Sequence, residues 1–294
     1  MASLDPDTDI MYVCRSNLVL RSQMRVILSE TYNRKRLPEA MEHNVETVWS
    51  DRLAKNPKLY NGTKFRIDSV SIEGDALTVN LGVTCYKEYI GSNWSPNVEL
   101  YQTLGRQYCN NPQVYLSDPL GVGSFVLTSD NRVILLRRSV HCGEAPGLWD
   151  VPGGHAEPEE LVGKKSFEEI DVSSMDSQAV TDEIFDSILR EIRDEVNLPQ
   201  SSLSDPELLG IARNTTSASR PSMEFLVRCS LKSEEVVSRY QQGNQAEADE
   251  STSIKMLPLE DAVVLETKNP DLWREMAPSG KGCFILYRLT NRSP

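Results

Sequence analysis

Apolar side chains recur at regular intervals along the first 115 residues and predict one helix followed by two strands. Within residues 38–53 they return every three or four positions, as on one face of a helix. Residues 64–72 and 77–81 instead alternate polar and apolar side chains, which is typical of strands with one buried face. We therefore expect residues 1–115 to form an α+β domain at the N-terminus.

The rest of the chain, residues 116–294, predicts a second α+β domain that is richer in strands. Short apolar runs that predict strands occur at 122–127, 132–136, 208–212 and 223–227. The clearest helix signal lies between them, where five apolar residues stand four positions apart: Val180, Ile184, Ile188, Ile192 and Val196. Residues 271–277 and 282–289 predict a last pair of helices, whereas the polar residues 241–253 predict an acidic loop.

The net charge of −12 limits the partners that the chain can bind. A protein this acidic repels nucleic-acid backbones, so we expect no nucleic-acid partner. No apolar run approaches the roughly 18 residues that cross a bilayer, and the first ten residues lack the pattern of a secretory signal. Six scattered cysteines without a CxxC pair indicate reduced thiols. We therefore expect an intracellular protein, cytoplasmic or nuclear, with no membrane partner; the sequence leaves its oligomeric state open.

Three carboxylates cluster on the predicted helix, at Glu191, Asp194 and Glu195. Their i, i+3 and i+4 spacing places them on one side, where like charges destabilise a helix by about 0.2–0.5 kcal/mol per pair. A divalent cation would remove this repulsion, because Mg²⁺ prefers oxygen ligands and needs only one or two carboxylates when substrate phosphates supply the rest. The alternative is a solvated acidic face that pairs with Arg190 and Arg193.

Residues 190–198 resemble the second half of the Nudix box, the sequence pattern of a family of diphosphate hydrolases. Two positions depart from that pattern. Asp194 replaces a glutamate and keeps its charge on a shorter side chain. Asn197 replaces a glycine, and asparagine is the common substitute for glycine in the left-handed conformation that ends a helix. The acidic helix therefore matches the metal-binding half of the box.

The first half of the box is present but displaced. Gly153 and Gly154 resemble the glycine-rich loop that opens the box and lets the backbone approach the helix closely. The family pattern would then place the box arginine at position 168, whereas it occurs at Arg190. The chain therefore carries a 22-residue insertion inside the box, over about residues 161–182, which we expect at the surface. The insertion leaves the middle acid open among Glu160, Asp182 and Glu183.

The resemblance implies a fold, a chemistry and roles for several residues. The fold is an α/β/α sandwich with a mixed sheet, preceded by the N-terminal α+β domain. The chemistry is hydrolysis of a diphosphate with Mg²⁺, which Mn²⁺ can replace, held by Glu191 and Glu195. Asp194 would hold a second ion or take a proton, and Arg190 would orient a neighbouring carboxylate. Glu250 would act as the general base from a later loop, with a solvated acidic loop as the alternative.

Longer segments outside the box narrow the resemblance to one branch of the family, which cleaves UDP-glucose and UDP-galactose to UMP and the sugar 1-phosphate. These segments are residues 86–94, 118–123, 151–155, 194–199 and 209–214. The resemblance therefore implies a nucleotide sugar as the small-molecule partner. The alternatives are another diphosphate substrate, such as ADP-ribose, coenzyme A or a capped nucleotide, and a Nudix-fold binding module without catalysis.

The same resemblance suggests eight residues for substrate contacts. Tyr60 and Tyr86 would stack on uracil, with core packing as the alternative. Arg138 would meet phosphate, unless it is merely solvated beside Arg137. The others lie in or beside glycine-containing loops and would bind phosphate or sugar hydroxyls: Gly143, Asp150, His155, Glu157 and Ser279. The alternative for these five is a structural role, because many glycine loops are only turns and a lone histidine is usually structural.

Overall fold

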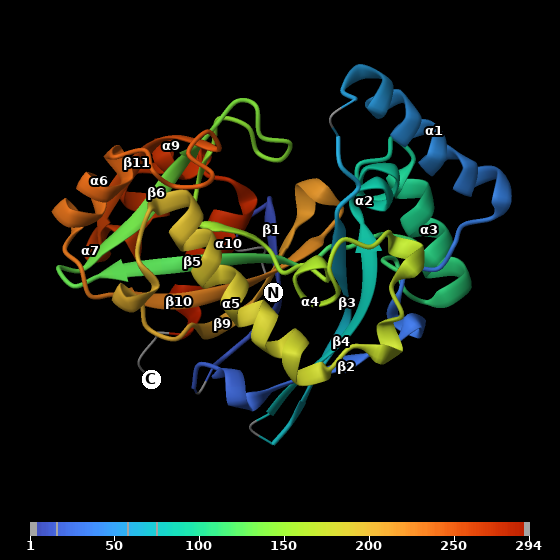
Figure 1. The fold of residues 1–294 in the computed structure, drawn as a ribbon, viewed down its shortest axis with the longest axis horizontal. Helices are drawn as coiled ribbons and strands as arrows, with labels where there is room; N and C mark the ends of the chain where they lie inside the picture. The colour runs from blue at the N-terminus through green and yellow to red at the C-terminus, as the bar shows by residue number, and fades with distance from the viewer. Residues whose placement is uncertain (1–4, 16, 58, 75, 291–294) are drawn as a thin grey trace.

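The computed structural model describes residues 5–15, 17–57, 59–74 and 76–290. Within them the chain forms a sheet of eight strands and a second sheet of three strands, which lie side by side in Figure 1. The strands are β1 (Thr8–Val13), β2 (Met24–Leu28), β3 (Thr63–Glu73), β4 (Ala76–Cys85), β5 (Gly121–Thr128), β6 (Arg132–Arg138), β7 (Trp149–Asp150), β8 (Gly153–His155), β9 (Glu207–Asn214), β10 (Arg220–Cys229) and β11 (Ser251–Pro258).

The helices of the described residues are distributed over both sheets. The α-helices are α1 (Glu39–Lys55), α2 (Tyr86–Ser92), α3 (Val98–Cys109), α4 (Glu159–Val162), α5 (Ser177–Val196), α6 (Ser233–Gln241), α7 (Leu259–Ala262), α8 (Leu265–Lys268), α9 (Pro270–Arg274) and α10 (Pro278–Thr290). Short 3-10 turns are η1 (Arg21–Gln23), η2 (Glu30–Tyr32), η3 (Phe167–Glu169), η4 (Val172–Ser174), η5 (Gln200–Ser202) and η6 (Thr215–Ser217). None of the helices in these ranges is long and apolar enough to span a membrane.

The large sheet is mixed and is covered by helices on both faces. Its strand order is β1-β9-β10-β5-β6-β11, with β7 paired to β6 and β8 to β5. β5 and β10 run parallel, whereas the other pairs are antiparallel. On β6, Ile134 and Leu136 belong to the core beneath α5, and Val133 and Leu135 belong to the core beneath α10. A strand buried on both faces appears in the sequence as an unbroken apolar run. The predicted α/β/α sandwich is confirmed.

The small sheet packs beside the large one and shares its core. Its order is β2-β4-β3, with β2 parallel and β3 antiparallel to β4. α5 lies across both sheets in Figure 1, and its apolar residues pack in one cluster with Phe65 and Leu81. The predicted boundary near residue 115 does not divide the two sheets cleanly, because β1 precedes it and yet pairs with β9 of the large sheet.

The elements predicted from strong periodicity are present, whereas three strands at the edges of the sheets were missed. The predicted helix over residues 38–53 corresponds to α1. The six predicted strands appear within a few residues of their expected ends, as β3, β4, β5, β6, β9 and β10. β1, β2 and β11 were not predicted, and β11 takes up the last three residues of the loop expected at 241–253. Each of these three strands lies at the edge of its sheet and buries few of its side chains, so its apolar pattern is weak.

The insertion inside the box is less superficial than expected. Ile170 and Val172 are buried in the main core, and Met175 packs beside them. α5 already begins at Ser177, so the last six residues of the expected insertion, 177–182, are the first turns of the box helix. The sequence did not predict this burial, because the few apolar residues stand singly among Ser, Asp and Glu.

Candidate active site

The acidic helix α5 is fixed at both ends by local signals. The Asp176 carboxylate caps its N-terminus by accepting a hydrogen bond from the Ala179 N–H (2.7 Å). Asn197 ends it in the left-handed conformation, with φ of +64°, as its place in the box suggested. The apolar stripe of the helix faces the core, and Glu195 lies at the edge of that stripe, only 4% exposed. A carboxylate therefore enters the protein interior at the end of α5.

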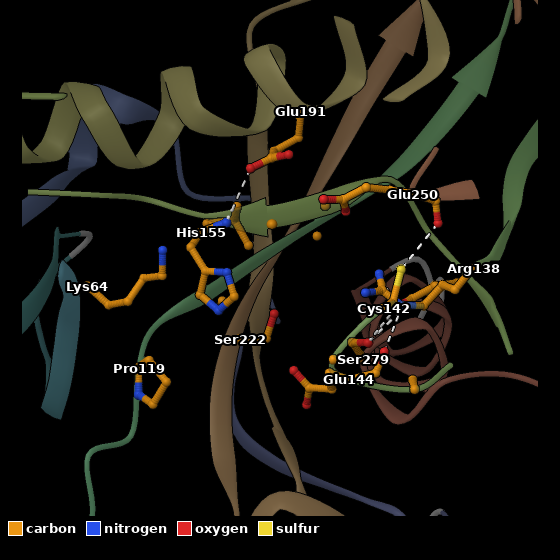
Figure 2. Close-up of a pocket in the computed structure, with 18 of the residues that line it drawn as sticks. Lys64, Pro119, Arg138, Cys142, Glu144, His155, Glu191, Ser222, Glu250 and Ser279 are labelled. Carbon is orange, nitrogen blue, oxygen red and sulfur yellow. Dashed lines mark hydrogen bonds and ion pairs between the residues drawn. The ribbon is translucent and has the colours of Figure 1, made fainter. Parts of the chain in front are cut away.

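Two carboxylates of α5 accept hydrogen bonds from the glycine-rich loop. The Gly153 N–H donates to Glu195 Oε2 (2.9 Å), and the His155 N–H donates to Glu191 Oε1 (3.3 Å), as Figure 2 shows for the latter. A Cβ on Gly154 would lie 2.0 Å from Glu191 Oε1, and one on Gly153 would lie 2.3 Å from the Val122 carbonyl oxygen. The backbone contact at Gly153 requires glycine, and a Cβ on Gly154 would displace the Glu191 carboxylate, so the loop and the helix together hold the two carboxylates in place.

A third element adds two more carboxylates. The loop after α6 docks on α5 through a hydrogen bond from the Glu247 N–H to the Asp194 carbonyl oxygen (2.9 Å). One carboxylate oxygen from each of Glu195, Glu247 and Glu250 lies within 4.8 Å of the other two. Glu250 was a candidate from the sequence, whereas Glu247 was missed. Nothing in the order Glu-Ala-Asp-Glu favours Glu247 over Asp249 until the backbone is known.

These carboxylates lack compensating cations. Burial, and next the Glu247 charge, raise the pKa of Glu191 to about 8; burial and the Glu191 charge raise the pKa of Glu195 well above its usual value. Burial and the Glu250 charge raise the pKa of Glu247 to about 7. The nearby arginines, Arg138, Arg190 and Arg193, pair instead with other acids. Oxygen donors with unbalanced negative charge are the donor set of a divalent cation such as Mg²⁺.

The other charged residues of the box point elsewhere. Arg190 Nη2 pairs with Glu183 Oε1 (2.6 Å), which also accepts a hydrogen bond from the Glu157 N–H (3.2 Å). Of the three candidates for the middle acid, Glu183 is the one that Arg190 contacts; Asp182 pairs with Arg21 (3.1 Å), and Glu160 is exposed. The Asp194 carboxylate pairs with Arg193 (2.7 Å) and is not part of the carboxylate cluster.

A cavity of about 560 Å³ opens beside the carboxylates, between the two sheets. Of the sequence candidates, twelve line it: Tyr60, Tyr86, Arg138, Gly143, Asp150, Gly153, Gly154, His155, Glu157, Glu191, Glu250 and Ser279. Arg190, Asp194 and Glu195 do not, and Glu195 reaches the site only through its buried oxygens. The cavity also exposes residues that the sequence reasoning missed, including Lys64, Glu144, Arg220 and Ser222. Figure 2 shows Glu191 and Glu250 on one side of it and Glu144 and Ser279 on the other.

The cationic side chains of the cavity each have a carboxylate partner. Arg138 Nη1 lies 3.8 Å from Asp150 Oδ2, and Asp150 also accepts a hydrogen bond from Ser279 Oγ (3.0 Å). Lys64, on β3 of the small sheet, forms an ion pair with Glu157. These pairs orient the positive groups toward the cavity while they leave few free charges.

The aromatic and imidazole candidates occupy different depths. Tyr60 is 58% exposed at the rim, and its hydroxyl donates to Glu159 (2.8 Å). Tyr86 is half-buried, with its ring edge-on to Trp49 at 6.3 Å. Burial, and next the Lys64 charge, hold the pKa of His155 well below 6.5, so its imidazole is neutral. In Figure 2 this imidazole points away from α5 into the pocket.

Comparison with known proteins adds a family match and full-length relatives. Residues 118–278 match the model of the NUDIX domain. The chain is 41% identical to uridine diphosphate glucose pyrophosphatase NUDT22 of Homo sapiens over 99% of this chain and 95% of that protein. It is 39% identical to the protein of the same name from Bos taurus over 97% of both chains. Nudix hydrolase 9 of Arabidopsis thaliana is 31% identical over 91% of this chain and 86% of its own length.

Proposed function

We propose that this chain, which belongs to the Nudix family, hydrolyses the diphosphate of UDP-glucose and UDP-galactose to UMP and the sugar 1-phosphate. Two relatives named as UDP-glucose pyrophosphatases match it along almost their whole length, so the likeness includes the N-terminal part as well as the Nudix domain. The carboxylate cluster of Glu195, Glu247 and Glu250 beside the cavity is the observation that supports catalysis over binding alone.

The donor set fits a divalent cation, for which we propose Mg²⁺ with Mn²⁺ as a substitute. Glu191 and Glu195 on α5 would hold it, together with Glu247 from the loop after α6. When bound, the cation neutralises charge on the diphosphate and lowers the barrier to attack on phosphorus. Gly153 and His155 contribute by donating backbone hydrogen bonds that hold Glu195 and Glu191 in position.

The reaction consumes one water molecule. Its oxygen bonds to one phosphorus, the bond from that phosphorus to the bridging oxygen breaks, and the proton passes to a carboxylate. We assign this base to Glu250, because its side chain is exposed to the cavity and belongs to the carboxylate cluster. Arg190 acts at one remove: it pairs with Glu183, which accepts the Glu157 N–H and so fixes the chain after the glycine-rich loop.

The remaining lining residues suit the rest of a nucleotide sugar. Arg138 would meet the diphosphate, with Asp150 and Ser279 holding it in orientation. Tyr60 and Tyr86 would contact the uracil. His155, which stays neutral, would exchange hydrogen bonds with phosphate or sugar hydroxyls without adding charge. Gly143 leaves room at the wall, since a Cβ there would lie 3.3 Å from the Tyr86 hydroxyl.

The proposal is tested by incubating the protein and Mg²⁺ with UDP-glucose, UDP-galactose, ADP-ribose, coenzyme A and a capped dinucleotide. We expect UMP and sugar 1-phosphate from the first two substrates and much slower cleavage of the others. Glu195→Gln should lower kcat by about 100-fold or more, because it removes a charged ligand at the reacting site. Glu207→Gln, at a partly exposed carboxylate on β9, is the matched control. Absence of UMP with the wild-type protein would overturn the proposal.

A further inference from the structure

Glu144 has the densest set of polar contacts in the loop that joins β6 to β7. Its side chain is 23% exposed, and four donors surround Oε1: Asn214 Nδ2 (3.0 Å), Ser217 Oγ (3.2 Å), Arg220 Nη2 (3.2 Å) and Tyr89 OH (3.4 Å). Three of these donors lie on or between β9 and β10, whereas Tyr89 belongs to α2 beside the small sheet. One carboxylate therefore ties the loop to both halves of the molecule.

The same loop is tied to the proposed catalytic groups. The Glu144 carbonyl oxygen accepts a hydrogen bond from Arg138 Nε (3.0 Å), which turns the guanidinium toward the cavity. At the other end of the loop, the Ser139 N–H donates to the Glu250 carbonyl oxygen (2.7 Å). The loop thus connects the cation that would meet phosphate with the chain that carries the proposed base.

Arg220 depends on Glu144. Its side chain is 5% exposed, and its Nε and Nη1 have no hydrogen-bond partner among the described residues. Glu144 is its ion-pair partner, with Nη2 3.2 Å from Oε2. A buried cation whose carboxylate is removed keeps its desolvation cost and loses the compensating charge, so it must move or take another anion.

The backbone on both sides of this contact is strained. Ala145, directly after Glu144, has φ of +46°, and Ala218 and Ser219, directly before Arg220, have φ of +55° and +69°. Non-glycine residues rarely adopt this conformation unless the surrounding structure imposes it. The Glu144–Arg220 contact therefore joins two strained turns at the cavity wall.

We infer that Glu144 is a positioning residue for the diphosphate site. Its carboxylate locks the loop of residues 139–148 against β9 and β10, and its carbonyl oxygen aims Arg138 at the substrate. This inference rests on the proposed function for the identity of the substrate. The positioning role itself requires only that the ligand carries a diphosphate group.

The variant Glu144→Gln tests the inference, with Glu42→Gln as the matched control. Glu42 also pairs with a buried arginine, Arg34, but lies on α1 and does not line the cavity. Glutamine keeps an acceptor for Asn214 and Ser217 and removes the charge that balances Arg220. For UDP-glucose with Mg²⁺ we expect Glu144→Gln to raise KM about tenfold with kcat changed less than about threefold, as for a lost charge-assisted contact. Glu42→Gln should lower the melting temperature less, because Arg34 keeps its ion pair with Glu88 (2.8 Å), and it should leave KM unchanged.

Binding of Mg²⁺ with inorganic diphosphate, measured by calorimetry, separates this inference from the proposed function. We expect the wild-type protein and Glu42→Gln to bind this probe alike and Glu144→Gln to bind it about tenfold more weakly. If UDP-glucose is not cleaved but this difference appears, the proposed substrate is wrong and the positioning role holds. If UDP-glucose is cleaved and Glu144→Gln matches Glu42→Gln in KM and in probe binding, Glu144 is only structural. Failure of the wild-type protein to bind the probe also overturns the inference.

A double-mutant cycle provides a second measurement if Glu144→Gln folds poorly. Arg220→Met removes the buried cation that Glu144 balances. In that background Glu144→Gln should restore part of the lost melting temperature yet leave KM at the raised value of either single variant. Additive changes in KM would contradict a shared action of the two residues.

Discussion

The two sides of the cavity differ in how their charges are balanced. On the cationic side, Arg138, Lys64 and Arg220 each face a carboxylate of the same protein. On the acidic side, the carboxylates crowd together, and burial raises the pKa of Glu191 to about 8. The charges of the cationic side are therefore balanced without a ligand, whereas those of the acidic side are balanced only by protons or by an added cation.

This difference separates two ways of preparing a site. A positive group held by its own carboxylate is oriented in advance and loses little freedom when a phosphate arrives. An unbalanced acidic cluster instead stores repulsion that a divalent cation relieves. The cationic side should therefore control mainly how tightly the substrate binds, and the acidic side should control how fast it reacts.

The largest effect is expected from Glu247→Gln, which removes an acidic ligand that the sequence did not reveal. Glu247 lies within 4.8 Å of Glu195 and Glu250 through its carboxylate oxygens. We expect kcat to fall by about 100-fold with KM nearly unchanged, as for loss of stabilisation confined to the transition state. Steady-state hydrolysis of UDP-glucose measures it, and Glu234→Gln, exposed on α6, is the control. Wild-type kcat in Glu247→Gln would remove this residue from the site.

How much the sequence predicted depends on where the signal lies. The five apolar residues of α5 are visible in the sequence because a helix buried on one face must repeat them. Glu191 and Glu195 follow from that helix, since spacing along one element determines which side chains share a face. Within the described residues, the other eleven cavity-lining candidates came from likeness to a family and not from periodicity.

Contacts between distant segments account for what the sequence did not predict. Glu247 reaches Glu195 because the loop after α6 docks on the Asp194 carbonyl, a backbone contact without a sequence pattern. Lys64 lies on β3, and Glu144 lies in the loop after β6. Both line the cavity because of how the two sheets pack, which no local sequence pattern shows. β1 likewise pairs with β9 across some 200 residues, so its six residues carried no local mark of their place.

Without a divalent cation, the buried carboxylates of the acidic side should make the unfolding free energy depend on pH. With the pKa of Glu191 at about 8 and that of Glu247 at about 7, both from 4.5, the folded protein binds more protons than the unfolded chain between those limits. The unfolding free energy of the metal-free protein therefore falls as pH rises from about 4.5 to about 8. Mg²⁺ binds the deprotonated carboxylates, so it should stabilise most at the upper end.

We expect Mg²⁺ to raise the melting temperature by at least about 2 °C at pH 8 and by less at pH 5.5, compared with excess EDTA. Thermal unfolding followed by calorimetry or fluorescence measures both values. Equal shifts at the two pH values, or no shift at either, would contradict a cation held by these acids. Glu195→Gln should reduce the shift at pH 8.

On the cationic side, neighbouring arginines on β6 provide a matched pair. Arg138 lines the cavity, whereas Arg137 points away and pairs with Glu275 (2.5 Å). Arg138→Met should raise KM for UDP-glucose about tenfold, because it removes a charged contact to phosphate, and Arg138→Lys should recover part of the loss. Arg137→Met should leave KM unchanged. Equal effects at the two positions would mean that net charge matters and orientation does not.

The smallest effect on KM is expected at the rim of the cavity, where the contact with the substrate would be aromatic and not ionic. Tyr60 is 58% exposed, and its hydroxyl bonds to Glu159 (2.8 Å), so core packing does not explain its ring. If the ring stacks on uracil, Tyr60→Phe should leave KM within about twofold, and Tyr60→Ala should raise it about fivefold, since stacking contributes ~1–3 kcal/mol per base. Tyr108→Ala, at a tyrosine 69% exposed on α3, is the control. A loss in Tyr60→Phe as large as in Tyr60→Ala would assign the effect to the hydrogen bond with Glu159 and not to stacking.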